Sequence, residues 1–218
     1  MNCDRIAPFY RWLEYLAFGR ELERRRLRFL PSVHSARRAL VIGDGDGRFL
    51  ARLARQNREA SIDSIDLSAK MLTLARSRAG DRVRHRQADV LTCSLPESEY
   101  DLIVTHFFWD FFEAREGAIL AERLGAAASG DAMWLISEFR QPGKGWRAVW
   151  AWVWLRALYL FFGATTGLET RRLVDHRPLV AREGFQLKRE EVTRFGLIAS
   201  ELWVRTGGNS TSSRSLLP

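Results

Sequence analysis

Short apolar stretches alternate with helical patterns along the middle of the chain. Helices are predicted where apolar residues recur every three or four positions, and strands in short stretches between them. The predicted strands cover residues 39–42, 61–65, 83–87, 101–105 and 132–139. The predicted helices between them cover residues 49–58, 68–78 and 113–127. Alternation at this spacing indicates crossover connections and a parallel sheet covered on both faces, so we predict a doubly wound α/β domain.

The segment before the first predicted strand has a helical pattern. In residues 6–30 apolar side chains recur close to helical spacing, with arginines and glutamates between them. Gly19 is expected to divide this segment into two helices, and residues 31–35 to end it. The sequence therefore predicts a helical cap in front of the sheet.

Four more elements are predicted after the last core strand. Residues 146–162 and 173–182 have helical patterns. Residues 185–193 and 198–205 have strand patterns and are joined through Gly196. We expect these two strands to form an antiparallel hairpin on the edge of the sheet.

Size and composition are those of one ordinary globular domain. The chain has 218 residues, of which 46% are apolar and 28% charged. The formal charge is +8 and is carried almost entirely by arginine, since there are only three lysines, Lys70, Lys144 and Lys188. This charge is explained either by attraction to phosphates or by a genome that favours arginine codons. Charge alone therefore does not indicate a function.

The cysteines and the first residues of the chain bear on the cellular compartment of the protein. Cys3 and Cys93 lie in no disulfide framework or zinc-binding spacing, and no metal site is predicted. Residues 1–11 carry charges and a proline where a signal peptide needs an unbroken apolar stretch. We therefore expect a cytoplasmic protein.

A glycine-rich loop is the strongest chemical signal. Residues 39–48, ALVIGDGDGR, are an apolar strand that runs into a G-x-G-x-G turn. Glycines let the backbone turn sharply and let a ligand lie against it without a Cβ in the way. Asp66 follows the second predicted strand, 19 positions after Gly47, where a carboxylate can accept hydrogen bonds from two ribose hydroxyls. Together they indicate a nucleoside ligand.

The glycine spacing separates two kinds of nucleoside ligand. A dinucleotide fingerprint has its third glycine one position later than Gly47, where this chain has Arg48. From residue 38 to residue 139, the motifs resemble those of the class I S-adenosylmethionine-dependent methyltransferases, a family with a Rossmann-like fold. The resemblance implies S-adenosylmethionine as the cofactor.

The resemblance assigns roles to individual residues. It implies that the glycine loop packs against the methionine part of the cofactor and that Asp66 binds the ribose. It further implies that Asp89, in RQADV, accepts a hydrogen bond from the adenine amino group, and that residues 100–106 border the transferred methyl group. The cofactor-binding residues implied in the core are Gly43, Asp44, Gly45, Gly47, Asp66, Leu67, Met71, Asp89 and Val90.

The chain departs from the family pattern at one position and has a second likeness at its start. Many family members have an acidic residue where this chain has Val41, which leaves the binding of the cofactor's amino end unassigned. Residues 4–10, followed by Phe18 and Gly19, are similar to the opening of the quinone-biosynthesis C-methyltransferases. That likeness implies that Tyr10 covers the cofactor; the alternative is that Tyr10 only anchors a helix.

The predicted organisation is one methyltransferase domain over residues 1–205. Its parts are a helical cap (1–35), a cofactor-binding core (36–140), acceptor-side helices (141–184) and a terminal hairpin (185–205). Residues 206–218 are rich in glycine, serine and threonine and are expected to be disordered.

A general base is needed only if the methyl acceptor must lose a proton. The candidates at the carboxyl edge of the sheet are His106, Asp110 and Glu138. His106 directly follows the fourth strand and titrates near neutrality, so we prefer it to the others; a structural histidine is the alternative. The segment THFF, residues 105–108, lacks the Asn/Asp-Pro-Pro-Tyr motif of many nitrogen-methylating relatives. Methylation of nucleobases or exocyclic amines is therefore disfavoured.

The segment 146–162 carries four tryptophans and is apolar on nearly every side. Arg147 and Arg156 interrupt it, and its uninterrupted apolar run is too short to cross a bilayer. It is either an apolar pocket or membrane-surface helix for a hydrophobic acceptor, or a core helix. We predict a small apolar or amphipathic acceptor, with peripheral membrane contact as one form of this hypothesis.

Two other classes of function stay open. A nucleic-acid methyltransferase would explain the basic charge, but the sequence has no separate RNA-binding module or basic arm, so nucleic acid is not the favoured partner. A catalytically silent subunit that binds the cofactor and assists a partner is the other alternative. The sequence indicates neither the acceptor atom nor the oligomeric state.

Overall fold

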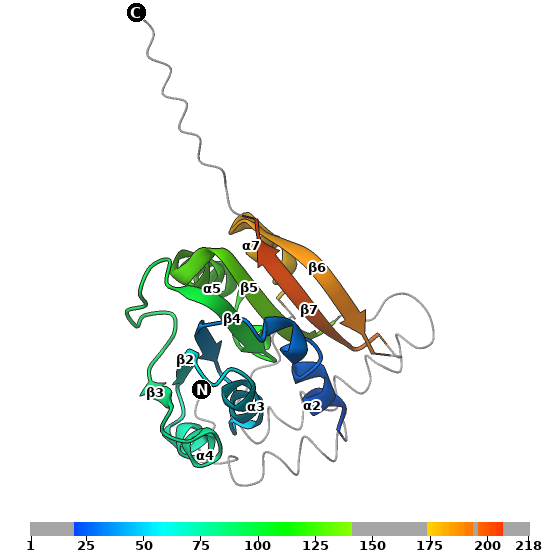
Figure 1. Cartoon of the computed structure of the whole chain (residues 1–218). Helices are drawn as coiled ribbons and strands as arrows, with labels where there is room; N and C mark the ends of the chain where they lie inside the picture. Colours follow the sequence, from blue (N-terminus) through cyan, green and yellow to red (C-terminus); the bar gives the residue numbers. More distant parts are fainter. Residues whose placement is uncertain (1–19, 141–173, 194–195, 207–218) are drawn as a thin grey trace, which may run out of the picture.

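One seven-stranded mixed sheet forms the centre of the molecule (Figure 1). The computed structural model describes residues 20–140, 174–193 and 196–206. The strand order is β3-β2-β1-β4-β5-β7-β6, with β1 to β5 parallel and the last two strands antiparallel. The strands are β1 (Arg38–Ile42), β2 (Ser61–Asp66), β3 (Val83–Gln87), β4 (Tyr100–His106), β5 (Ala128–Phe139), β6 (Phe185–Val192) and β7 (Ile198–Arg205).

Helices cover both faces of the sheet. One face carries α2, α3 and α4, and the other carries α5 and α7 (Figure 1). The helices are α2 (Glu21–Arg26), α3 (Arg48–Gln56), α4 (Ala69–Ala79), α5 (Ala114–Ala127) and α7 (Arg177–Arg182), with short 3-10 turns η2 (Leu30–Val33) and η3 (Trp109–Phe111). The predicted doubly wound α/β fold with a terminal antiparallel hairpin is confirmed. That hairpin joins the sheet through β7, which pairs with β5.

Several predicted boundaries were wrong: α2 ends at Arg26 instead of residue 30, α3 ends at Gln56 instead of residue 58, and two later elements begin elsewhere. β5 begins at Ala128 instead of residue 132, because Ala128 pairs with Tyr100 ahead of a register shift in β4. The helix predicted from residue 173 begins only at Arg177, and Pro178 lies in its first turn. Proline is favoured there, since its missing N–H is one that the helix could not use.

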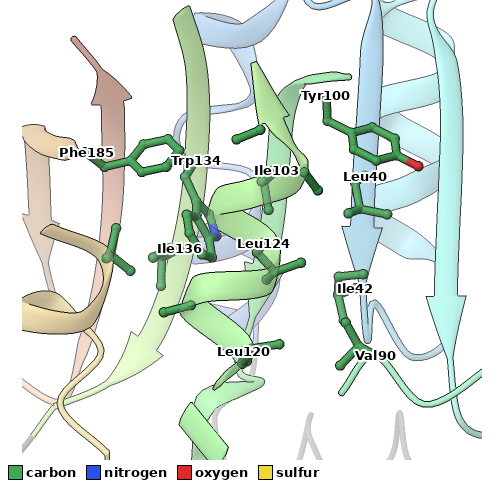
Figure 2. Packing of buried hydrophobic residues seen from close by; sticks show 14 of the residues in the cluster. Leu40, Ile42, Val90, Tyr100, Ile103, Leu120, Leu124, Trp134, Ile136 and Phe185 are labelled. Carbon is green, nitrogen blue, oxygen red and sulfur yellow. The ribbon is translucent and has the colours of Figure 1, made fainter. Parts of the chain in front are cut away.

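The core on the α5 face forms because α5 presents one apolar side to the sheet. Figure 2 shows Leu120 and Leu124 of α5 packed toward Ile103 of β4 and Trp134 of β5, all fully buried. A capping box, in which Glu113 and Glu116 satisfy each other's backbone N–H groups, starts the helix. The position of α5 therefore follows from a local start signal and from this packing.

A single hydroxyl satisfies two indoles inside this core. Trp109 and Trp134 both donate their Nε1–H groups to Thr105 Oγ1, at 3.2 and 3.0 Å. All three residues are fully buried. Buried indole N–H groups need an acceptor, so Thr105 fixes the turn after β4 against β5.

Replacing Thr105 by valine should destabilise the fold. The Thr105→Val side chain has the same shape but leaves two buried indole donors without an acceptor, each costing about 1–3 kcal/mol. We expect urea unfolding to show a loss of at least about 2 kcal/mol. Thr105→Ser keeps the oxygen and should lose only about 1 kcal/mol for its missing methyl group. Equal stability of the valine variant and the wild type would contradict this role.

Candidate functional site

The predicted cofactor residues meet at the carboxyl edge of the parallel strands. β1 lies between β2 and β4, so the loop after β1 has the ends of both neighbours beside it. The Gly43 N–H donates to the Ile65 carbonyl of β2, with an N···O distance of 2.9 Å. In open α/β sheets a ligand binds in this place, where the strand order reverses.

Two glycines of the loop are required for different reasons. Gly43 and Gly47 have φ angles of 64° and 81°, which favour glycine. A Cβ on Gly43 would lie 2.4 Å from the Phe108 ring, and one on Gly47 would lie 2.4 Å from the Ala75 Cα in α4. Gly43 thus lets the turn after β4 approach the loop, while Gly47 lets α3 and α4 pack closely. Gly45, with φ of 65°, completes the turn.

Asp66 is held in place at the end of β2. Its Oδ1 accepts the Ser68 N–H at 2.8 Å, and Ser68 in turn caps α4 by accepting the Met71 N–H at 3.2 Å. Leu67, between these two polar residues, is 52% exposed. The exposed leucine offers an apolar surface to a ring, and the neighbouring carboxylate of Asp66 offers hydrogen-bond acceptors to hydroxyls. Met71 is buried and supports α4 from inside.

Asp89 lies just beyond the end of β3. Its Oδ1 accepts the Leu91 N–H at 2.9 Å, which fixes the carboxylate at the exposed start of the connection to β4. Val90, the next residue, is buried in the core, where Figure 2 shows it near Ile42. Arg123 of α5 donates to the Val90 carbonyl at 2.9 Å and also to the Cys93 carbonyl. The connection from β3 to β4 contains no helix, and these two hydrogen bonds attach it to α5.

The turn after β4 is held by a buried carboxylate. Glu138 Oε2 accepts the N–H groups of Phe108 and Trp109, each at 3.0 Å. Burial, and then the charge of Asp110, raises the pKa of Glu138 well above its ordinary value, although backbone N–H groups oppose that shift. Phe107 has a φ of 53°, a region that non-glycine residues rarely adopt. The turn is therefore a strained segment pinned by hydrogen bonds, a combination common at functional sites.

His106 lies beneath this turn, on the face that carries α3. It is 4% exposed, and its ring meets the Phe49 ring edge-on at a centroid distance of 4.7 Å. Neither ring nitrogen has a hydrogen-bond partner among the described residues. Burial, and next the charge of Arg26, lowers the pKa of His106 well below its ordinary value. The imidazole is therefore neutral at pH 7, because burial and the charge of Arg26 disfavour its protonated form.

Asp44, in the glycine loop, also points inward. It is 7% exposed, and its Oδ2 accepts the Leu50 N–H of α3 at 3.0 Å. Sequence reasoning placed Asp44 at the site but missed Arg26 of α2, whose charge lowers the pKa of Asp44 while burial, the larger effect, raises it to about 7. It also missed the contact of Phe108 with Gly43, because no local pattern links these two segments. Tyr10 and the aromatic segment 146–162 lie outside the described residues.

Comparison with known proteins supports a methyltransferase. Residues 39–126 match the family described as a methyltransferase domain. The demethylmenaquinone methyltransferase of Deinococcus radiodurans is 31% identical over 64% of this chain and 59% of its own length. The corresponding Thermus thermophilus protein is 31% identical over 65% of this chain and 66% of its own length. The chain thus spans less than two thirds of these two relatives.

A solved structure agrees with the sequence match. The N-methyltransferase NodS of Bradyrhizobium japonicum, in complex with S-adenosylhomocysteine, covers 90% of this chain and 97% of its own, with a TM-score of 0.64 and 15% identity. Together, the matched domain, the relatives and the fold support a class I S-adenosylmethionine-dependent methyltransferase. The predicted family, its likeness to quinone C-methyltransferases and the predicted cofactor are confirmed.

Removing the charge of Asp66 should weaken cofactor binding. Asp66→Asn keeps an oxygen for the Ser68 N–H, and it would replace the charged hydrogen bonds that we predict to the ribose with weaker neutral ones. We expect calorimetry to show at least a roughly tenfold loss of affinity for S-adenosylhomocysteine.

A matched control is Asp101→Asn. Asp101 also accepts backbone N–H groups, those of Arg37 and Arg38, but lies at the start of β4, away from the site. This variant should bind S-adenosylhomocysteine as the wild type does. If Asp66→Asn binds S-adenosylhomocysteine with wild-type affinity, Asp66 does not contact the cofactor.

Proposed function

We propose that this protein transfers the methyl group of S-adenosylmethionine to a small apolar or amphipathic acceptor. The observation that carries the proposal is the aromatic turn after β4. Phe107, Phe108 and Phe111 are each half-buried there, and Phe108 lies against Gly43 of the cofactor loop. Aromatic faces beside a cofactor loop favour an apolar ligand over a charged one.

The names of the relatives support an acceptor of the quinone type. Two relatives with 31% identity are named demethylmenaquinone methyltransferases. We extend this name to the present chain only as far as an apolar ring with a hydroxyl or carbonyl group. The Phe108 ring also contacts those of Phe111 and Phe112 at centroid distances of 6.2 and 5.0 Å, which gives such a ring a stacking surface.

The cofactor fits the residues at the loop and the strand ends. Gly43 and Gly45 line the turn, Asp66 and Leu67 bind the ribose and one face of the adenine, and Asp89 binds the adenine amino group. Gly47, Met71 and Val90 support these positions from inside, and Tyr10 is proposed to cover the site. When bound, the cofactor supplies an electrophilic methyl group on sulfur, so the protein mainly has to position the acceptor.

His106 is the proposed general base. Because its pKa is lowered by burial, it is deprotonated at neutral pH. Glu138 is a weaker candidate, since its carboxylate already accepts backbone N–H groups from Phe108, Trp109 and Phe139. The base acts only if the acceptor must lose a proton.

Membrane contact through the segment 146–162 is a further part of the proposal. Among the described residues, no helix is long and apolar enough to span a bilayer. The segment itself lies outside those residues, and its four tryptophans are the reason to propose that an apolar acceptor enters beside it. We propose a cytoplasmic protein that meets its acceptor there or at a membrane surface.

The test is transfer of a labelled methyl group. The protein is incubated with S-adenosylmethionine carrying a tritiated methyl group and with lipid, RNA and protein fractions of a cell extract. We expect label in the lipid fraction. His106→Gln should lower kcat by roughly a hundredfold or more, because a positioned base contributes about that factor. Wild-type kcat should stay level from pH 9 to below pH 6.5, since His106 becomes protonated only below its ordinary pKa.

The control and the contrary outcomes are distinct. His34→Gln changes an exposed histidine bonded only to the Pro31 carbonyl among the described residues, and should leave kcat unchanged. Label in the RNA fraction would indicate a nucleic-acid methyltransferase instead. Binding of S-adenosylhomocysteine without label in any fraction would indicate a catalytically silent subunit. A wild-type kcat in His106→Gln would show that His106 is not the general base.

A further inference from the structure

Charge is distributed unevenly between the two halves of the parallel sheet. Residues 48–87, which form α3, β2, α4 and β3, contain ten basic and four acidic side chains. Residues 100–139, which form β4, η3, α5 and β5, contain two basic and seven acidic ones. The first segment therefore has a net charge of +6 in a chain whose total is +8, and the second has −5. Codon usage acts on the whole chain, so it does not explain this separation.

The basic segment presents its charge on the outer side of two neighbouring helices. α3 and α4 lie side by side (Figure 1), and together they contain six basic residues and no acidic one. Exposed arginines project from both helices and from the loops that follow them. We call these the arginine face: Arg52 and Arg55 of α3, Arg76 of α4, and Arg58 and Arg82 of the loops.

The arginine face has no anionic partner within the part of the chain that the structure describes. None of its five side chains forms an ion pair or hydrogen bond there, not even with the exposed acids Glu59 and Asp81. Other arginines of the same segment are neutralised. Arg78 pairs with Asp46, and Arg84 pairs with Asp63. The protein thus compensates these arginines and leaves the outer ones available.

A face of one sign is costly to keep. Arg52 and Arg55 are three positions apart on α3 and so are neighbours on its surface, where like charges destabilise a helix. Protein surfaces usually intersperse both signs, which avoids this repulsion. An anionic partner would compensate the arginine face and remove the cost.

The composition of the segment favours lipid phosphates over single-stranded nucleic acid. Its one phenylalanine, tryptophan or tyrosine is Phe49, which is 1% exposed. Proteins that bind single strands stack the bases on exposed aromatic rings, which this segment does not offer. A layer of anionic headgroups needs only distributed basic charge.

The arginine face adjoins the edge of the sheet that holds the cofactor residues. α3 begins directly after Gly47, and α4 begins after Ser68, two positions beyond Asp66. A bilayer along this face would therefore run past the edge where the proposed acceptor enters. An apolar acceptor would be concentrated in that bilayer.

We propose that the arginine face docks the protein on a membrane surface that contains anionic lipids. The guanidinium groups donate charge-assisted hydrogen bonds to the lipid phosphates. The segment 100–139 is acidic and would be repelled, so the charge separation also orients the molecule. The inference rests on the proposed function for its apolar acceptor, but docking itself requires no methyl transfer.

The experiment measures cosedimentation of the full chain with lipid vesicles. One set is made of phosphatidylcholine alone, and the other contains about 30% phosphatidylglycerol, which makes it anionic. We expect the wild type to bind the anionic vesicles at least about tenfold more tightly than the neutral ones. This preference should disappear when NaCl is raised from about 0.05 M to about 0.5 M, because salt screens exposed charges.

Two double variants with the same change in net charge test the location. Arg52→Gln with Arg55→Gln removes two charges from the arginine face and keeps residues that favour a helix. Each arginine near an anionic surface contributes about fivefold in affinity, so binding should weaken about tenfold to thirtyfold. The control, Arg115→Gln with Arg182→Gln, changes two exposed arginines of α5 and α7 that have no partner among the described residues. It should bind as the wild type does.

The contrary outcomes are separate from one another. Equal losses in the two double variants would show that net charge, and not the arginine face, controls binding. Equal binding of the wild type to both kinds of vesicle would also overturn the proposal. So would binding of an RNA oligonucleotide, or a salt-sensitive dimer in light scattering, that depends on Arg52 and Arg55 while anionic vesicles are not bound.

Binding of S-adenosylhomocysteine separates this inference from the proposed function. Both double variants should bind it with wild-type affinity, which also reports that they are folded. A wild type that docks on anionic vesicles but does not bind S-adenosylhomocysteine would contradict the proposed function and leave the docking face in place. Normal binding of S-adenosylhomocysteine without docking would overturn this inference alone.

Discussion

The site depends on one contact, the approach of the turn after β4 to the glycine loop after β1. Glu138 holds this turn through the N–H groups of Phe108 and Trp109, and Phe108 then lies where a Cβ on Gly43 would be. The contact requires both a fixed turn and a glycine. It places aromatic side chains beside the glycine loop, where the proposed function has the cofactor meet an apolar acceptor.

Two buried carboxylates differ in how far the protein stabilises their charge. Although burial opposes its ionisation, Glu201 has a pKa lowered to about 2, because His176, Trp203 and Arg177 donate to it or attract it. This network fixes α7 to β7 and has a structural role. Asp44 has one backbone donor and a pKa raised to about 7.

The sequence was sufficient for the features that depend on local patterns. Periodicity located the strands of the parallel sheet, and the spacing of Asp66 from the glycine loop indicated a nucleoside ligand. Gly47 shows the limit of such reasoning: its pattern suggested a ligand contact, whereas the structure also requires it for the approach of Ala75 in α4. Arg26 could not be identified, because only tertiary packing brings α2 to Asp44. The early start of β5 has the same kind of cause, a pairing with Tyr100 that no local signal encodes.

The central claim is that this edge of the sheet binds S-adenosylmethionine and not a dinucleotide. Calorimetry of the whole chain with S-adenosylhomocysteine and, separately, with NAD tests it most directly. The glycine spacing at Gly43 to Gly47, the carboxylates of Asp66 and Asp89 and the exposed Leu67 predict binding of S-adenosylhomocysteine and none of NAD. Measurable binding of NAD without binding of S-adenosylhomocysteine would contradict the account.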